Sequence, residues 1–165
     1  MAALAADLKS EIISGIVHQT RNKLEGETAP AERFVRQYFG DLGADFLLEP
    51  TPDNLYGSAL SIWSFMRKRL PGAPKIRVYN PTEEEHGWHS THTVVEIVND
   101  DMPFLVDSIV NAINRQQLTV HLLIHPIIRV TRDKGGVLAD VLAPGSTDGI
   151  AESILHVEVS QRSAP

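Results

Sequence analysis

The stretch at residues 93–130, TVVEIVNDDMPFLVDSIVNAINRQQLTVHLLIHPIIRV, predicts the centre of the fold. Its first residues, 94–98, are mostly β-branched, which suits a pleated and largely buried strand. The acidic turn 99–101 ends that strand. An Asp here can cap the next helix, and Pro103 is tolerated in a first helical turn because those amides have no intrahelical partner. Apolar residues then recur at helical spacing: Met102, Leu105, Val106, Ile109 and Ile113.

From Thr119 the apolar period changes to two, which predicts one strand continuing to Val130. One face of that strand is apolar: Val120, Leu122, Ile124, Pro126, Ile128 and Val130. The other face is mixed: Thr119, His121, Leu123, His125, Ile127, Arg129 and Thr131. We therefore expect a sheet with a helix on one face and a largely polar second face, which is either open to water or covered by another subunit or domain.

The amino-acid composition excludes several classes of protein. The 165 residues carry 15 Lys and Arg against 21 Asp and Glu, a formal charge of −6 without a basic stripe, so nucleic acid is not an expected partner. There is no cysteine, which excludes disulfides, thiol nucleophiles and zinc–thiolate sites. No apolar run approaches the roughly 20 residues that cross a bilayer, so no membrane is expected. The N-terminus does not resemble a signal peptide, and the cytoplasm is the expected location.

The flanking sequence predicts an α+β chain in two parts. Residues 1–70 form a helical N-terminal segment with helices at 2–19, 31–39 and 51–69; the last begins at Thr51-Pro52, and its basic end at residues 67–69 suits the helix dipole. Residues 75–165 form an α/β domain with strands at 75–79, 137–142 and 153–160 and a hairpin at Gly135-Gly136. A ferredoxin-like βαββ unit would need a further helix and strand, so we expect this domain to be incomplete at its C-terminus.

The acidic turn is the first candidate site. Amides at a helix N-terminus can hold a carboxylate, and neighbouring carboxylates can hold an ammonium group, so the turn could bind a free amino acid. The alternative is that Asp100 and Asp101 only cap the helix. The candidate ligand-binding residues are Asn99, Asp100, Asp101, Met102, Pro103, Phe104 and Leu105.

Histidines are the second candidate. His121, His125 and His156 fall on the polar sheet face with Glu158 and Glu96, where a metal site could be assembled. Their spacing matches no recognised ligand pattern, and half-exposed strand histidines are common, so we expect no metal and treat these residues as weak candidates. Dinucleotide, P-loop and nucleophile-elbow motifs are absent, and we expect no catalytic residue here.

Four segments carry a family resemblance: LYGSALSIWSF at 55–65, RVYNPTEEEHGW at 77–88, residues 92–133, and SILHVEVS at 153–160. Together they resemble the N-terminal region of the large bacterial NAD-specific glutamate dehydrogenases. In that family this region carries ACT-like domains, βαββαβ modules that commonly bind amino acids and pair through sheets or helices. The catalytic domain lies far downstream.

The resemblance implies a non-catalytic regulatory or oligomerisation region. The parent enzyme would convert L-glutamate, NAD and water to 2-oxoglutarate, ammonium and NADH, while this chain would bind no cofactor. Expected partners are the rest of the same enzyme, a second copy through ACT-like domains, and a free amino acid as effector. ACT domains usually have glycine where this turn has Phe104, so a phenylalanine side chain could fill the ligand pocket and leave a structural module.

Overall fold

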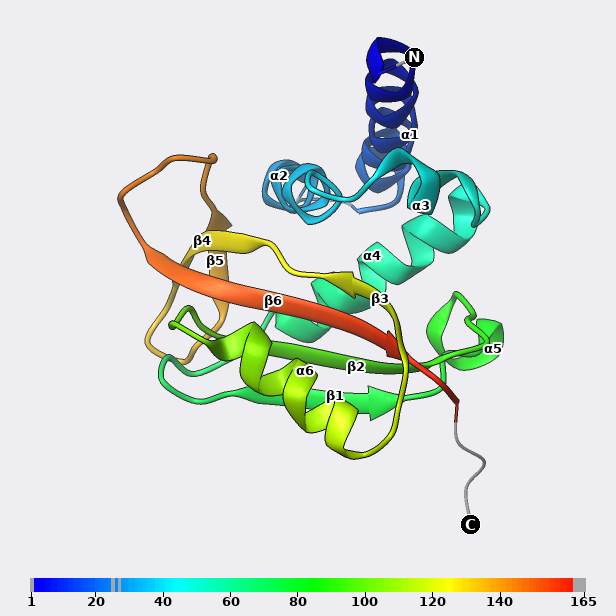
Figure 1. Cartoon of the computed structure of the whole chain (residues 1–165). Helices are drawn as coiled ribbons and strands as arrows, with labels where there is room; N and C mark the ends of the chain where they lie inside the picture. The colour runs from blue at the N-terminus through cyan, green and yellow to red at the C-terminus, as the bar shows by residue number, and fades with distance from the viewer. Residues whose placement is uncertain (1, 25, 27, 162–165) are drawn as a thin grey trace.

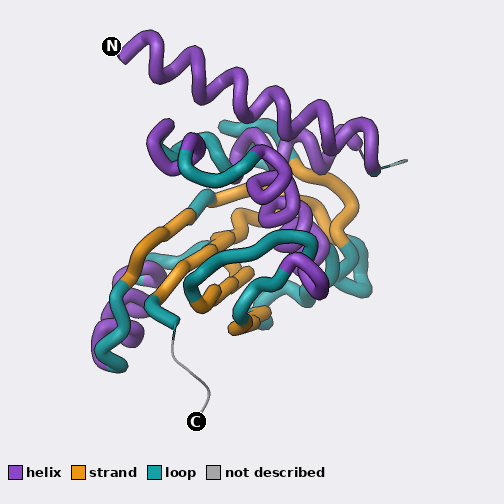
Figure 2. The backbone as a smooth tube through the Cα atoms, turned by 90° about the vertical axis from the view of Figure 1, so that its right-hand side faces the viewer, coloured by secondary structure: helices purple, strands orange, loops and turns teal. Residues whose placement is uncertain are grey.

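The computed structural model describes residues 2–24, 26 and 28–161, which form three layers (Figures 1 and 2). Helices from the N-terminal part cover one face of a six-stranded sheet, and helix α6 covers the other face. This arrangement confirms the predicted α+β class, with a helical N-terminal part followed by an antiparallel sheet. No helix in the described residues is long and apolar enough to cross a membrane.

The N-terminal layer consists of α1 (Ala2–Lys23), α2 (Thr28–Tyr38), α3 (Ala44–Leu48) and α4 (Pro52–Met66). The predicted start of α4 is confirmed, because Thr51 Oγ accepts a hydrogen bond from the amide of Asn54 at 3.2 Å and proline occupies the first turn. Helices α1 and α2 extend further into the predicted linker than expected, and α3 was not predicted. Aromatic side chains hold the layer together, with Phe34 packed between Tyr38 and Trp63.

The sheet contains β1 (Lys75–Tyr79), β2 (Thr93–Asp100), β3 (Val120–Ile124), β4 (Ile127–Arg132), β5 (Leu138–Val141) and β6 (Ile150–Val159). Strand order is β1-β2-β6-β4-β5, β3 also pairs with β6, and every pairing is antiparallel. The predicted hairpin between β4 and β5 is confirmed. A one-turn helix, α5 (Glu83–His86), lies in the loop before β2.

The arrangement of β2, α6 (Leu105–Arg115), β3 with β4, and β6 is that of a ferredoxin-like βαββ unit. Strand β1 precedes this unit in the chain and pairs with β2, so it lies at the edge that a fourth strand of such a unit would occupy. The division into parts at residues 70–75 stays a prediction. Helices α1, α2 and α4 share one hydrophobic core with β4 and β6.

The predicted continuous strand at 119–130 is wrong in two respects. It breaks at His125-Pro126, where proline has no amide to donate to the ladder. A register shift between Val120 and Leu122 also rotates the chain, so Val120 packs toward α6 whereas Leu122 and Ile124 pack toward the N-terminal helices. The predicted common face of these three residues therefore does not exist.

The predicted division into an apolar and a polar face is wrong, because the polar groups of β2 and β6 share a face with the predicted apolar residues Ile128 and Val130. This shared face is not open to water. Glu96, Glu152 and His156 are all almost fully buried, and Tyr38 of α2 packs edge-on against His156. The chain's own N-terminal helices cover this face, not another subunit or domain. Buried charges on this face must consequently be compensated within the chain.

A substitution at Gly57 of α4 tests the contact between the helices and the loop before β2. A Cβ at Gly57 would lie 2.2 Å from the carbonyl oxygen of Gly87 and 2.9 Å from Trp88 Cβ. We expect Gly57→Ala to lower the free energy of unfolding by about 1–3 kcal/mol or more, since backbone must move to admit the methyl group. Urea denaturation measures this difference.

Gly15→Ala is the matched control, because Gly15 is also helical and has nothing within 4 Å of an added Cβ. It should raise the free energy of unfolding by up to about 1 kcal/mol through helix propensity alone. If both variants change stability in the same direction, the proposed close approach of α4 to Gly87 is wrong.

Candidate functional site

The acidic turn lies at the end of β2, where its two aspartates face different partners. Asp100 is the last residue of β2, and its carboxylate accepts hydrogen bonds from Arg69 at 2.5 Å and from the amide of Gly72 at 2.9 Å. The carboxylate of Asp101 accepts from Ser153 Oγ at 2.8 Å. Both side chains are therefore engaged within the chain.

Neither aspartate caps α6, so the predicted capping is wrong. The helix begins at Leu105, after Met102 and Pro103, and its N-cap is Phe104, which makes no side-chain cap. Phe104 has φ +63°, in the left-handed region where the resemblance expected glycine. Its side chain is 78% exposed and so does not fill a buried pocket.

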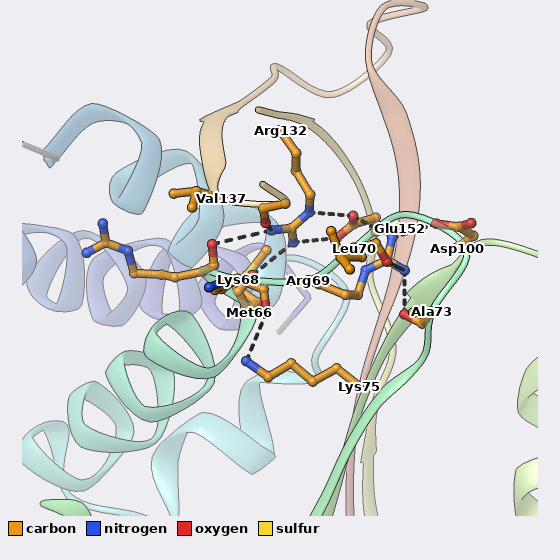
Figure 3. Close-up of polar contacts among 12 residues, drawn as sticks. Met66, Lys68, Arg69, Leu70, Ala73, Lys75, Asp100, Arg132, Val137 and Glu152 are labelled. Carbon is orange, nitrogen blue, oxygen red and sulfur yellow. Dashed lines mark hydrogen bonds and ion pairs between the residues drawn. The ribbon is translucent and has the colours of Figure 1, made fainter. Parts of the chain in front are cut away.

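Arg69 belongs to a buried ion-pair network that joins the end of α4 to the sheet (Figure 3). Glu152 lies between two arginines: it accepts two hydrogen bonds from Arg132, at 2.8 and 2.9 Å, and one from Arg69 at 2.7 Å. Arg132 also donates to the carbonyl of Met66. The predicted helix-dipole role of residues 67–69 is wrong for Arg69, because α4 ends at Met66 and Arg69 is a buried ion-pair partner.

The three candidate metal-ligand histidines have different neighbours. His156 lies between two glutamates in the sheet, whereas the ring of His121 stacks on that of His92 at a centroid distance of 4.1 Å. His125 borders a small hollow beside Pro126, and burial lowers its pKa. Within the described part of the chain, no three His, Cys, Asp or Glu side chains are arranged to hold a metal ion.

His156 is the centre of a second buried network. Its Nδ1 lies 3.0 Å from Glu96 Oε1, and its Nε2 lies 3.2 Å from Glu158 Oε1. Glu96 also accepts from Arg77 at 2.5 Å and from Tyr79 at 3.1 Å. Because each ring nitrogen faces a carboxylate, both nitrogens donate and the ring is an imidazolium.

The pKa shifts agree with this assignment. Burial lowers the pKa of His156, but its hydrogen bonds to Glu158 and Glu96 outweigh burial and raise the pKa above the ordinary 6.5. Burial raises the pKa of Glu158, but hydrogen bonds from His156 and His92 lower it to about 2. Glu96 is likewise lowered, by His156 and Arg77 against the effect of burial. The network is thus held in its charged form.

A hollow of about 300 Å³ opens beside this network, between the N-terminal helices and the sheet. Phe39, Leu42 and Leu122 are among its apolar lining residues, while His92 and His121 are among its polar ones. The sequence did not predict this hollow, because its walls come from the loop after α2, from α3 and α4, from the loop before β2, and from β3 and β6. Only the alternation of His156 and Glu158 on β6 pointed toward it.

Two further residues of the network were also missed. Arg77 and Tyr79 alternate on β1, and their side chains reach Glu96 on the neighbouring strand, where Arg77 is the register partner of Glu96. The alternation in the sequence was a signal for a shared face, but no pattern indicated the pairing of β1 with β2.

The family follows from comparison with known proteins. A family model described as "Glutamate dehydrogenase, ACT1 domain" matches residues 34–165. The chain belongs to this family. The resemblance drawn from the sequence is thereby confirmed, and the βαββ arrangement around α6 is the fold of this ACT1 domain as this chain adopts it.

Two relatives extend the match to nearly the whole chain. The chain is 35% identical over 162 residues to the NAD-specific glutamate dehydrogenase of Halomonas elongata, covering 96% of this chain and 10% of that protein. It is 33% identical over 162 residues to the enzyme of the same name from Pseudomonas aeruginosa, covering 97% of this chain and 10% of that protein. The chain thus spans about a tenth of the length of these curated relatives. No solved structure matches it.

Replacing His156 tests the charged network. We expect His156→Gln to lower the free energy of unfolding by about 3–5 kcal/mol, because Glu96 and Glu158 would remain buried without their shared cation. Urea denaturation of both proteins across a range of pH measures the difference.

The direction in which stability changes with pH can be stated for both high and low pH. The stabilisation from His156 is complete below its ordinary pKa of 6.5 and is lost as pH rises through the raised pKa of the folded state. The stabilisation from Glu158 is complete above 4.5 and is lost as pH falls toward about 2. The difference between wild type and His156→Gln should be largest between pH 4.5 and 6.5, and His89→Gln, at an exposed histidine, should show little change. A pH-independent difference would contradict an imidazolium at His156.

Phe104 tests the turn before α6. An L-residue in the left-handed region costs roughly 1–2 kcal/mol, and glycine costs roughly 0.5–1 kcal/mol in lost chain entropy. We therefore expect Phe104→Gly to raise the free energy of unfolding by about 0.5–1 kcal/mol. Phe104→Ala, which removes the ring but keeps the backbone strain, should not raise it; equal stabilisation by both variants would assign the effect to the exposed ring instead.

Proposed function

We propose that this chain is a non-catalytic regulatory and assembly region of a large NAD-dependent glutamate dehydrogenase. The observation that carries the proposal is the match of nearly the whole chain to about a tenth of each NAD-specific glutamate dehydrogenase, within an ACT1 domain family. The parent enzyme would convert L-glutamate, NAD and water to 2-oxoglutarate, ammonium and NADH, with NAD bound elsewhere in that enzyme. We expect the enzyme to work in the cytoplasm.

The state of the buried ionisable groups supports a structural role for them. Glu96, His156 and Glu158 satisfy one another at 3.0 and 3.2 Å, and Glu152 is held by two arginines. Groups that are buried and paired in this way cross-link the layers and are not poised to transfer protons to a substrate. We therefore assign the function of the domain to its surface.

Strand β1 is the surface element best suited to assembly. Among the described strands it pairs with β2 alone, so its other edge has free backbone groups. Its charged side chains face the helices: Arg77 binds Glu96, and Lys75 donates to the carbonyl of Phe65. On the opposite face Ile76 and Val78 are 59% and 63% exposed. The charges that usually protect an edge strand are thus turned away from this face.

Two copies of the chain can meet along this edge with complementary side chains. An antiparallel pair of β1 strands centred on Arg77 places Ile76 of one copy opposite Val78 of the other, as a two-fold interface requires. Each Arg77 keeps its own Glu96, so the two guanidinium groups meet already neutralised. Another part of the same enzyme could use the same edge.

Amino-acid sensing at residues 99–105 stays an alternative prediction. The ammonium group of a ligand would have to compete with Arg69 for Asp100 and with Ser153 for Asp101. This competition makes assembly the function that the geometry supports better.

Charges added to the edge test the assembly proposal in the full-length dehydrogenase. We expect Val78→Lys to reduce the size of the assembly, because a lysine on the apolar face would oppose its counterpart's Ile76. Analytical ultracentrifugation measures the assembly, and NADH formation from saturating glutamate measures turnover, which should persist because β1 lies outside the proposed catalytic part.

Ala139→Lys provides the matched control, since Ala139 is exposed on β5 at the opposite edge of the sheet. It should leave the assembly unchanged. An unchanged assembly for Val78→Lys would reject the β1 edge as an interface, and abolished turnover in an intact assembly would reject the non-catalytic role.

A further inference from the structure

The hollow beside the His156 network has the size and composition of a small-molecule site. Its volume of about 300 Å³ lies at the lower end of the range for such sites. Apolar atoms supply most of the lining surface, as in ligand pockets generally, and several polar side chains, among them His92, His121 and Glu158, also border the hollow. The hollow is separate from the acidic turn at 99–105, none of whose residues line it.

Two stacked imidazoles are among the polar groups that line the hollow. The rings of His92 and His121 lie 4.1 Å apart and 9° from parallel. His92 Nδ1 is 2.9 Å from Glu158 Oε2, and His121 Nε2 is 3.1 Å from Ser160 Oγ. In the described chain the second nitrogen of each ring, Nε2 of His92 and Nδ1 of His121, makes no hydrogen bond. Each ring thus has one nitrogen held in place and one available.

The available nitrogens suit an acceptor on the ligand. If the Ser160 hydroxyl donates to Nε2 of His121, then Nδ1 of that ring carries a proton that it can donate. His92 donates to ionised Glu158 through Nδ1, and a ligand carboxylate at Nε2 would place this ring between two carboxylates, the arrangement in which His156 donates through both nitrogens. A carboxylate, with two acceptor oxygens, matches a pair of donors from parallel rings.

The charged groups next to the two histidine rings carry no net charge that would repel an anion. Glu158 already accepts from His156, His92 and Ser90, and Glu96 is paired with Arg77 and His156. Two carboxylates and two cations therefore cancel in the buried network. Glu49 also borders the hollow, but it is exposed and water screens its charge.

We propose that this hollow binds a small apolar monocarboxylate. Its hydrocarbon part lies among Phe39, Leu42 and Leu122, and its carboxylate accepts hydrogen bonds from His92 and His121. The site joins the N-terminal helices to the sheet, so occupancy would tie the two layers together. This inference is independent of assembly through the β1 edge.

Matched pairs of probes test the head group. Phenylacetate and 4-methylpentanoate each have an apolar body and a carboxylate, and phenylacetamide and 4-methylpentanamide differ only in lacking the charge. Titration of the 165-residue chain near pH 6.5, followed by two-dimensional NMR of amide and methyl groups, should shift resonances of Trp88, Leu122 and Ile124. Each acid should bind at least tenfold more tightly than its amide, and acetate, without the apolar part, should bind weakly.

Two variants test the residues. His121→Phe keeps an aromatic ring at an exposed position but removes its nitrogens, and it should weaken phenylacetate binding at least fivefold. Ser58→Leu should fill the hollow from α4 and abolish binding of all probes while the amide spectrum stays folded. His86→Phe is the control, because His86 packs against Tyr79 outside the hollow, and this variant should bind like wild type.

Several results would overturn the proposal. These are equal affinity for acid and amide, shifts confined to residues outside the hollow, or equal affinities for His121→Phe and His86→Phe. Tighter binding of phenylalanine or leucine than of the matching acids would also overturn it and would assign an ammonium subsite to Glu49. The edge variant Val78→Lys should bind the probes normally, so failure of one proposal does not affect the other.

Discussion

The structure depends on neutralising the polar face of strand β6. Glu152, His156 and Glu158 alternate along this face, and the N-terminal helices cover it. Burying an unpaired charge would cost several kcal/mol, more than most single contacts can offset. Each charge is therefore matched from another segment: Glu152 by Arg69 and Arg132, and His156 by Glu96 and Glu158.

These matches also determine how the helical part sits on the sheet. Arg69 lies shortly after the end of α4 at Met66 and reaches both Glu152 and Asp100, so the end of α4 is anchored at the β2–β6 pair (Figure 3). At the other end of β6, Tyr38 and Trp88 pack around His156. The ion pairs at one end of β6 and the aromatic contacts at the other end together fix the position of the N-terminal helices on the sheet. The helices thus form a layer of the same core and not a separate appendage.

This arrangement places the two proposed functional surfaces on different sides of the sheet. The α6 side exposes apolar residues on β1 and at Phe104, which suits contact with protein. The helical side leaves a hollow whose polar lining includes His92 and His121.

The sequence by itself determined the local elements and the family. The β-branched run of β2, the Thr51-Pro52 start of α4 and the Gly135-Gly136 turn act through neighbours in the chain, so they could be predicted. Only the tertiary structure decided the partners of Asp100, Arg69, His156 and Glu158. The fate of a charged side chain depends on which distant segment is brought beside it, and hydrophobic periodicity carries no information on that choice. The acidic turn therefore looked like a helix cap, whereas chain segments far apart in sequence made it part of an ion-pair network.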